Sequence, residues 1–140
     1  MHIGIDFDGT LSTHGVPDSN SVPIKPTVEL VKCLLCLQIP VKIITARACS
    51  NNPERDEHIK YVQDWCLKNI GQILPVTAEK DYEMVCLIDD RAVTVHNNTG
   101  ILASDDQSYG VMFIKSIIGE GRWRELAFCR KLPVTQSTNF

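Results

Sequence analysis

The sequence lacks the features that would place the protein in a membrane or send it across one. It contains no apolar run close to the ~20 residues that a membrane-spanning helix requires. No apolar segment follows a basic start at the N-terminus, and an acid already stands at Asp6, so a secretory signal peptide is not expected. These absences predict a cytoplasmic protein without membrane contact.

An excess of positive charge is also missing. The 14 Lys and Arg residues are fewer than the 17 Asp and Glu residues, which gives a net charge of -3. Indiscriminate nucleic-acid binding by bulk charge needs a polycationic surface, so we do not expect it. A specific nucleic-acid partner stays open, because a local basic patch could form from Arg122, Arg124, Arg130 and Lys131.

Cysteine is present, but not in an arrangement typical of a disulfide framework or a metal site. The chain has six cysteines and no secretory signal, so reduced thiols are expected. Cys33 and Cys36 form a C-x-x-C pair inside the apolar, helical-looking run VELVKCLLCLQ. A redox motif would instead open a helix after a strand. We therefore predict free cysteines in the core.

The hydrophobic pattern predicts alternating strands and helices. With 140 residues and no repeat or long linker, the chain suits one domain over residues 1–132, followed by a frayed tail over 133–140. Strands are expected at residues 2–7, 41–47, 72–76 and 83–90, and helices at 26–37, 53–69 and 122–132. Residues 92–96 fit a loop or an edge strand, and residues 109–118 fit a helix or a strand.

This alternation predicts an α/β fold: a three-layer sandwich with a central, mainly parallel sheet. The run over residues 83–90 is continuously apolar, which is typical of a parallel strand covered on both faces. In such sheets the ligand crevice lies outside the carboxyl ends of the strands. Those ends therefore predict the position of the functional site.

Polar groups follow three of the predicted strands. Asp6 and Asp8 end the first, Thr45 and Arg47 the second, and the Asp89–Asp90 pair the fourth. Four carboxylates that converge on one crevice repel one another unless a cation lies among them. Hard carboxylate oxygens suit Mg²⁺, which typically binds one or two carboxylates together with substrate phosphate.

In order and spacing these motifs resemble the haloacid dehalogenase (HAD) superfamily of phosphotransferases. The first motif, DxDGT, stands at residues 6–10; the second is Thr45 in IITAR; the third is Lys80 in TAEKDYEMV; the fourth is Asp89 and Asp90 in LIDDRA. The resemblance covers residues 1–96 and implies the HAD-like Rossmannoid fold. The chain looks most similar to small capless bacterial and phage members, and to the phosphatase domain of polynucleotide kinases.

The resemblance implies roles for the acids. Asp6 would attack phosphorus and form an aspartyl-phosphate, which splits hydrolysis into two steps. Asp8 would protonate the leaving oxygen and then accept a proton from the attacking water, and carboxylate neighbours would raise its pKa. Mg²⁺ would be held by Asp6, the backbone carbonyl of Asp8, Asp89 and Asp90.

Further residues would bind the phosphate. The hydroxyl of Thr45, the main-chain N–H of Ala46 and the side chain of Lys80 are expected to contact phosphoryl oxygens, while Gly9 lets the backbone turn sharply beneath them. Together with the metal, Lys80 would offset the negative charge of the phosphate and Asp6.

The two arginines that follow motifs have two interpretations each. Arg47 and Arg91 either contact the substrate or pair with an acid of the cluster.

No cap domain fits, because residues 11–44 and 48–79 are used up by single loops, helices and strands. The open crevice favours a substrate that supplies its own cover, such as a macromolecular end, or a site completed by a second subunit of a homo-oligomer. The predicted function is Mg²⁺-dependent hydrolysis of a phosphomonoester, either a small molecule such as a nucleotide or a nucleic-acid end. The alternatives are a phosphate-binding module without catalysis and a subunit of a nucleic-acid repair assembly.

Overall fold

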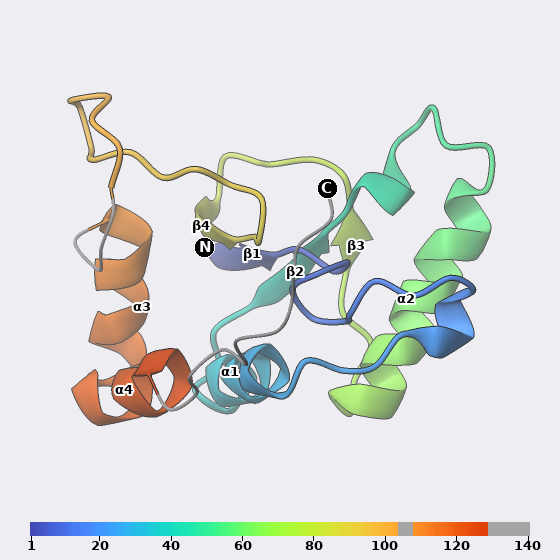
Figure 1. Cartoon of the computed structure of the whole chain (residues 1–140), viewed down its shortest axis with the longest axis horizontal. Coiled ribbons are helices and arrows are strands. Elements are labelled where there is room, and N and C mark those ends of the chain that lie inside the picture. Colours follow the sequence, from blue (N-terminus) through green and yellow to red (C-terminus); the bar gives the residue numbers. More distant parts are fainter. Residues whose placement is uncertain (104–107, 129–140) are drawn as a thin grey trace.

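The computed structural model describes residues 1–103 and 108–128 (Figure 1). Its strands are β1 (His2–Ile5), β2 (Val41–Ile44), β3 (Val76–Thr77) and β4 (Met84–Ile88), and its helices are α1 (Lys25–Cys36), α2 (Arg55–Asn69), α3 (Tyr109–Ile118) and α4 (Glu120–Phe128). Two short 3₁₀ turns, η1 (Asp18–Asn20) and η2 (Ala46–Ala48), lie in the loops after β1 and β2.

The four strands form one parallel sheet in the order β3-β2-β1-β4. β1 is central, and its Ile5 stands opposite Ile43 of β2 and Ile88 of β4. The β-branched residues of these strands favour this extended, half-buried geometry. The predicted parallel α/β sheet is therefore confirmed.

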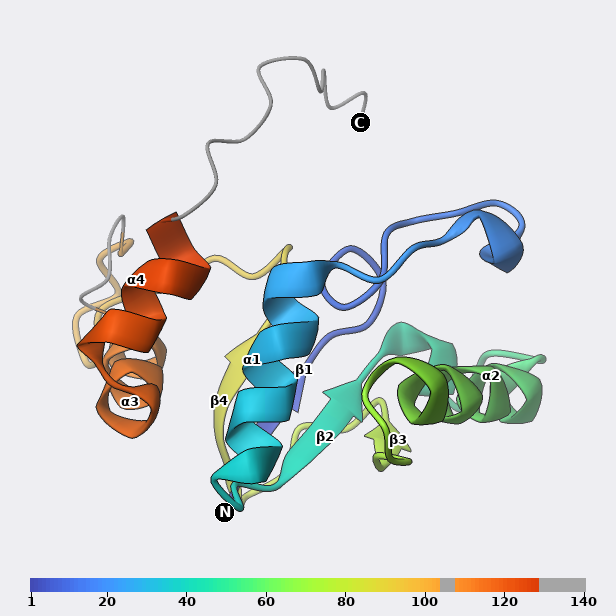
Figure 2. The ribbon, with the colours of Figure 1, turned by 90° about the horizontal axis from the view of Figure 1, so that it is seen from below.

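The helices lie on one face of this sheet. The connections β1–α1–β2 and β2–α2–β3 step across the sheet in the same direction, so right-handed crossovers place α1 and α2 on the same side (Figures 1 and 2). On that side each strand contributes every second residue to the core, together with the helices. The most buried members are Ile3, Ile5, Phe7, Leu11, Val31, Leu34, Ile43, Val62 and Cys66.

The three-layer arrangement is wrong for the described residues, because no helix among them covers the other face. That face is crossed by the loop 78–83, where Asp81 accepts a hydrogen bond from Lys42 Nζ at 2.8 Å. This connection is too short to hold the helix that usually joins parallel strands. β4 lies at the sheet edge with Leu87 37% exposed, so the prediction of a strand covered on both faces is also wrong.

Other predicted boundaries need smaller corrections. The strand expected at 72–76 is reduced to Val76–Thr77, because Pro75 has no N–H to donate and only its carbonyl accepts, from Ile43. Residues 109–118 form helix α3, and its N-cap Ser108 accepts a hydrogen bond from the Val111 N–H at 3.3 Å. Residues 92–96 form only an isolated antiparallel bridge, Val95 to Leu102, outside the sheet.

The end of the predicted last helix, residues 129–132, and the predicted tail, residues 133–140, lie outside the described residues. In the described part of the chain no helix is both long enough and apolar enough to span a membrane.

The cysteines of the described part are all free. Cys66 is fully buried, and burial raises the pKa of its thiol to about 12, so it is a core thiol as predicted. Cys36 is exposed at the end of α1, so its predicted place in the core is wrong. Cys129 lies outside the described residues.

Two leucines near the end of α1 offer a test of the core. Leu34 is fully buried, whereas Leu37 is 48% exposed. Leu34→Ala should lower the free energy of unfolding by about 2–5 kcal/mol, because it removes buried methyl groups and leaves a cavity. Leu37→Ala should cost less than about 1 kcal/mol. Urea unfolding of both variants measures the difference, and equal losses would contradict this packing.

Candidate metal and phosphate site

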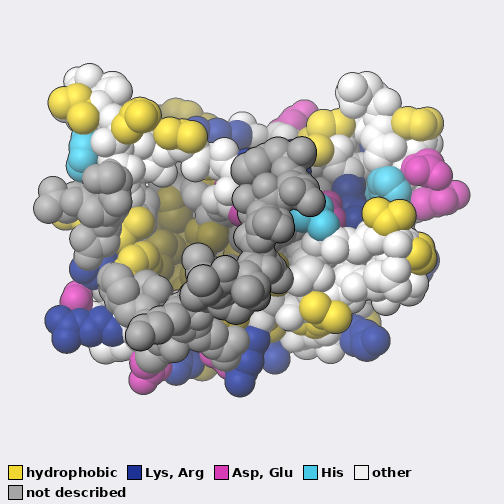
Figure 3. Space-filling view, viewed as in Figure 1, with side chains coloured by type: hydrophobic (Ala, Val, Ile, Leu, Met, Phe, Trp, Pro, Cys, Tyr) yellow, Lys and Arg dark blue, Asp and Glu magenta, His cyan; other side chains and the backbone are white. Residues whose placement is uncertain are grey.

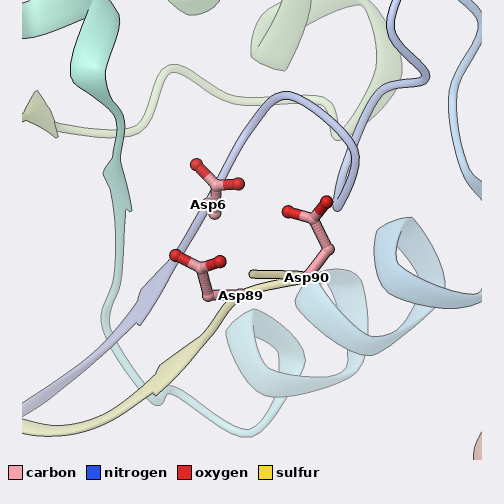
Figure 4. Close-up of side chains that lie close together, drawn as sticks. All are labelled: Asp6, Asp89 and Asp90. Atoms are coloured by element: carbon pink, nitrogen blue, oxygen red, sulfur yellow. The ribbon is translucent and has the colours of Figure 1, made fainter. Parts of the chain in front are cut away.

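Three carboxylates meet where β1 and β4 end. Parallel pairing of these strands brings Asp6 beside the end of β4, and the Asp6 N–H donates to the Ile88 carbonyl at 2.9 Å. Asp89 and Asp90 follow directly. One oxygen of each of the three side chains lies within 4.8 Å of the others (Figure 4). The structure thus brings together the first and fourth sequence motifs.

Asp6 is the most perturbed acid of this cluster. Partial burial, together with the charges of Asp89 and Asp90, raises the pKa of Asp6 to about 6, although a backbone hydrogen bond at Phe7 opposes the shift. Burial makes the largest contribution to this rise, and repulsion from the neighbouring carboxylates adds to it. Three hard oxygens at this spacing fit a divalent cation such as Mg²⁺, which would relieve the repulsion.

Thr10 connects the acids of the cluster and was not singled out from the sequence. Its Oγ1 lies 3.2 Å from Asp90 Oδ1 and 3.5 Å from Asp6 Oδ2, and it accepts the Asp90 N–H at 3.2 Å. The Thr10 side chain is buried whereas Asp90 is exposed, so these contacts are partly buried. The signal was available, because Thr10 is the last residue of the DxDGT motif.

Gly9 has a positive φ of 82°, a region that residues with a side chain rarely adopt. A Cβ at this position would stand 2.5 Å from Asp90 Oδ2. Glycine is therefore required at position 9 for two reasons: the positive φ of the turn and the close approach of Asp90. The predicted sharp turn at Gly9 is confirmed.

Of the two interpretations of Arg47, the structure shows pairing with acids, and contact with a substrate stays a prediction. Its Nε and Nη2 donate to the two oxygens of Asp8 at 2.7 and 2.8 Å, and its Nη1 and Nη2 donate to those of Asp18 at 3.0 and 2.9 Å. The guanidinium also lies over the rings of Phe7 and Tyr61. We call this group the arginine clamp.

The surroundings of Asp8 differ from those that we predicted. The carboxylates that we predicted beside Asp8 lie beside Asp6 instead, and the charged neighbour of Asp8 is Arg47. Hydrogen bonds from Arg47 hold the pKa of Asp18 below its usual value. Asp18 was missed because it stands in the variable-looking loop after the first motif, where nothing in the sequence marks its partner.

A crevice of about 580 Å³ joins the acid cluster and the clamp. Its walls include Asp6, Asp8, His14, Thr45, Ala46, Arg47, Asp89 and Arg91. Thr45 is buried, and its hydroxyl accepts the Arg47 N–H at 3.2 Å. Arg91 is exposed, and its main-chain N–H donates to Asp89 Oδ1 at 2.7 Å. The second motif therefore opens onto the same space as the acids.

Lys80 is not brought into this crevice. It is exposed in the loop 78–83 and does not line the cavity. Among the described residues of the cavity wall, the lysine and arginine side chains are those of Arg47 and Arg91 alone. A role for Lys80 in phosphate binding remains a prediction.

Comparison with models of protein families, with curated proteins and with solved structures yields no match for the chain. Only the residues of the crevice therefore indicate a function.

The glycines at positions 9 and 71 form a matched pair. Both have positive φ, but a Cβ on Gly71 would meet open space. Gly71→Ala should cost about 1 kcal/mol of unfolding free energy for the backbone alone. Gly9→Ala should cost about twice that, because Asp90 must also leave Thr10. Urea unfolding compares them, and equal losses would argue against the tight approach of Asp90.

The raised pKa of Asp6 predicts a pH dependence of stability in the absence of divalent ions. Because the folded state binds the Asp6 proton more tightly than the unfolded state, this carboxyl should destabilise the fold increasingly as the pH rises from about 4 to about 6. Asp6→Asn should therefore raise the Tm by a few degrees at pH 7, with little gain at pH 4. Thermal unfolding in EDTA measures the Tm of both proteins at pH 7 and at pH 4. An equal gain in Tm at the two pH values would contradict the raised pKa of Asp6.

Proposed function

We propose that the chain is a Mg²⁺-dependent phosphomonoester hydrolase of the HAD-like Rossmannoid type that acts through an aspartyl-phosphate on Asp6. The observation that carries the proposal is the meeting of Asp6, Asp89 and Asp90 at the carboxyl ends of two paired strands. The order of the motifs along the sequence supports the same function.

The donor set fits the metal that the proposal needs. Asp6, Asp89 and Asp90 would hold Mg²⁺ through carboxylate oxygens, with the Asp8 carbonyl as a further ligand, while Thr10 keeps Asp90 in place. Bound there, the ion would neutralise charge on a phosphoryl group and orient it towards Asp6.

In the first step a carboxylate oxygen of Asp6 forms a bond to phosphorus as the bond between phosphorus and the ester oxygen breaks. The leaving oxygen takes a proton from Asp8. In the second step water attacks the phosphorus, Asp8 accepts its proton, and inorganic phosphate leaves Asp6 as a free carboxylate. In the structure each oxygen of Asp8 also accepts one hydrogen bond from Arg47, which leaves a further lone pair on each oxygen for these proton transfers.

Groups for the phosphoryl oxygens line the same crevice. The Thr45 hydroxyl and the Ala46 N–H are proposed to donate to them, the turn at Gly9 is proposed to pass beneath them, and Arg91 supplies positive charge at the exposed side. Lys80, which does not form part of the crevice wall in this structure, would join them only if its side chain turned towards the phosphate. These donors replace water around the phosphate dianion.

The substrate class is proposed from the open crevice. Without a cap domain, the site suits a small phosphorylated molecule such as a nucleotide, or a macromolecular end that provides its own cover. A long nucleic acid is disfavoured by local charge pairing, because Arg122 pairs with Glu125 and Arg124 with Glu120. A cytoplasmic location is part of the same proposal.

Replacement of the nucleophile tests the function. Asp6→Asn should lower the turnover of an aryl phosphate at least about 10³-fold, because an amide cannot form the acyl-phosphate. Asp56→Asn, at an exposed acid on α2, is the matched control and should keep full activity. EDTA should abolish the wild-type activity and Mg²⁺ should restore it. Unchanged turnover in the Asp6 variant would disprove the nucleophile assignment.

A phosphate-binding module without catalysis is the second candidate. The specific observation in its favour is the bidentate pairing of Asp8 with Arg47, which occupies both oxygens of the proposed acid and base. Two measurements together distinguish this module from the hydrolase: calorimetry of beryllofluoride binding in the presence of Mg²⁺, and an assay of turnover. Binding without turnover of nucleotides, aryl phosphates or phosphorylated oligonucleotides would favour the module.

A further inference from the structure

A second cavity lies on the helical side of the sheet edge, away from the arginine clamp. This apolar groove of about 470 Å³ runs between β4 and helices α3 and α4. Its walls include Leu30, Cys86, Tyr109, Ile114, Trp123 and Leu126. Asp89 is the one carboxylate among the described residues of the wall, and no Lys or Arg contributes to it. Figure 3 shows a hollow lined by hydrophobic side chains on this part of the surface.

The strand beside the groove has an unpaired side. β4 is the last strand in the order β3-β2-β1-β4, so within the described residues no strand pairs with its outer edge. An open edge next to apolar surface is a template for another extended segment.

The chain carries a segment of matching character. Residues 92–103, which we call the arm, leave the end of β4 and form a short antiparallel pair: the His96 N–H donates to the Ile101 carbonyl, and the Ala103 N–H donates to the Thr94 carbonyl. The arm has no Asp, Glu, Lys or Arg. Its large aliphatic side chains are exposed, with Val93 75%, Val95 46%, Ile101 64% and Leu102 66% accessible.

Such exposure is unfavourable for an isolated chain in water. Uncharged aliphatic clusters on a protein surface mark contact sites, because their burial removes apolar area from water. The arm begins at the rim of the groove, where Thr94 contributes to the wall, but its exposed side chains do not fill that groove. Both surfaces are therefore apolar, nearly uncharged and unoccupied by each other within one copy.

We propose that two copies of this chain form a symmetric dimer in which the arm of each copy docks in the groove of the other. A two-fold axis makes the contact self-complementary, so that two arms and two grooves are buried together. One side of the arm's antiparallel pair then also lies along the open edge of β4. This contact needs no catalysis, and it stands or falls separately from the proposed hydrolase activity.

Three glutamate substitutions in the full-length chain test the contact. Ile101→Glu places a charge on the arm. Tyr109→Glu places one in the groove wall at the first turn of α3, where an acid is compatible with the helix. Leu67→Glu, at a 52% exposed leucine on α2, is the control outside both surfaces. Sedimentation equilibrium over a range of concentrations measures the dimer dissociation constant of each.

Wild type and Leu67→Glu should dimerise alike, whereas the arm and groove variants should each dimerise at least about tenfold more weakly, because each buries an unpaired charge. A mixture of the arm and groove variants should dimerise more strongly than either variant alone, because the mixed dimer keeps one intact arm in one intact groove. Circular dichroism confirms that the variants are folded.

Several results would overturn the proposal. A wild-type chain that stays monomeric at all concentrations would do so, as would a dimer that both variants leave unchanged. A monomer that binds the dye 8-anilinonaphthalene-1-sulfonate in a manner sensitive to Tyr109→Glu would assign the groove to a small apolar ligand instead. A mixture no stronger than the separate variants would exclude reciprocal exchange.

Discussion

Mutual repulsion of three carboxylates is the constraint on which the site depends. Asp6, Asp89 and Asp90 are held together because β1 and β4 pair in parallel and end side by side. The pKa of Asp6 is raised to about 6, first by burial and then by the charges of Asp89 and Asp90. A cation among the three carboxylates would offset their repulsion, which is the basis for proposing a metal site here.

The other half of the crevice is organised by an attraction. Arg47 pairs with Asp8 and Asp18 and lies over two aromatic rings, so the loop after β1 is tied to the turn after β2. The clamp shapes the wall opposite the acid cluster and occupies the carboxylate that the proposed chemistry would use.

The one-sided covering of the sheet distinguishes this chain from a three-layer sandwich. Among the described residues only the loop 78–83 crosses one face, so the core is built mainly on the helical face. On that face the packing leaves an apolar groove beside the β4 edge, and an uncharged arm follows β4. The groove and the arm therefore both lie at the β4 edge of the sheet.

The sequence alone determined the parallel α/β sheet, helices α1 and α2, and the acids at the strand ends, because hydrophobic periodicity and local motifs carry that information. It did not determine which acids would meet. Asp8 and Asp6 stand two residues apart, yet strand pairing turns Asp6 towards Asp89 while Arg47 draws Asp8 away. Tertiary structure decided the partners of Asp18 and Arg47, the lack of a described helix on one face of the sheet, and the position of Lys80 outside the crevice wall, because each depends on contacts between residues far apart in the chain.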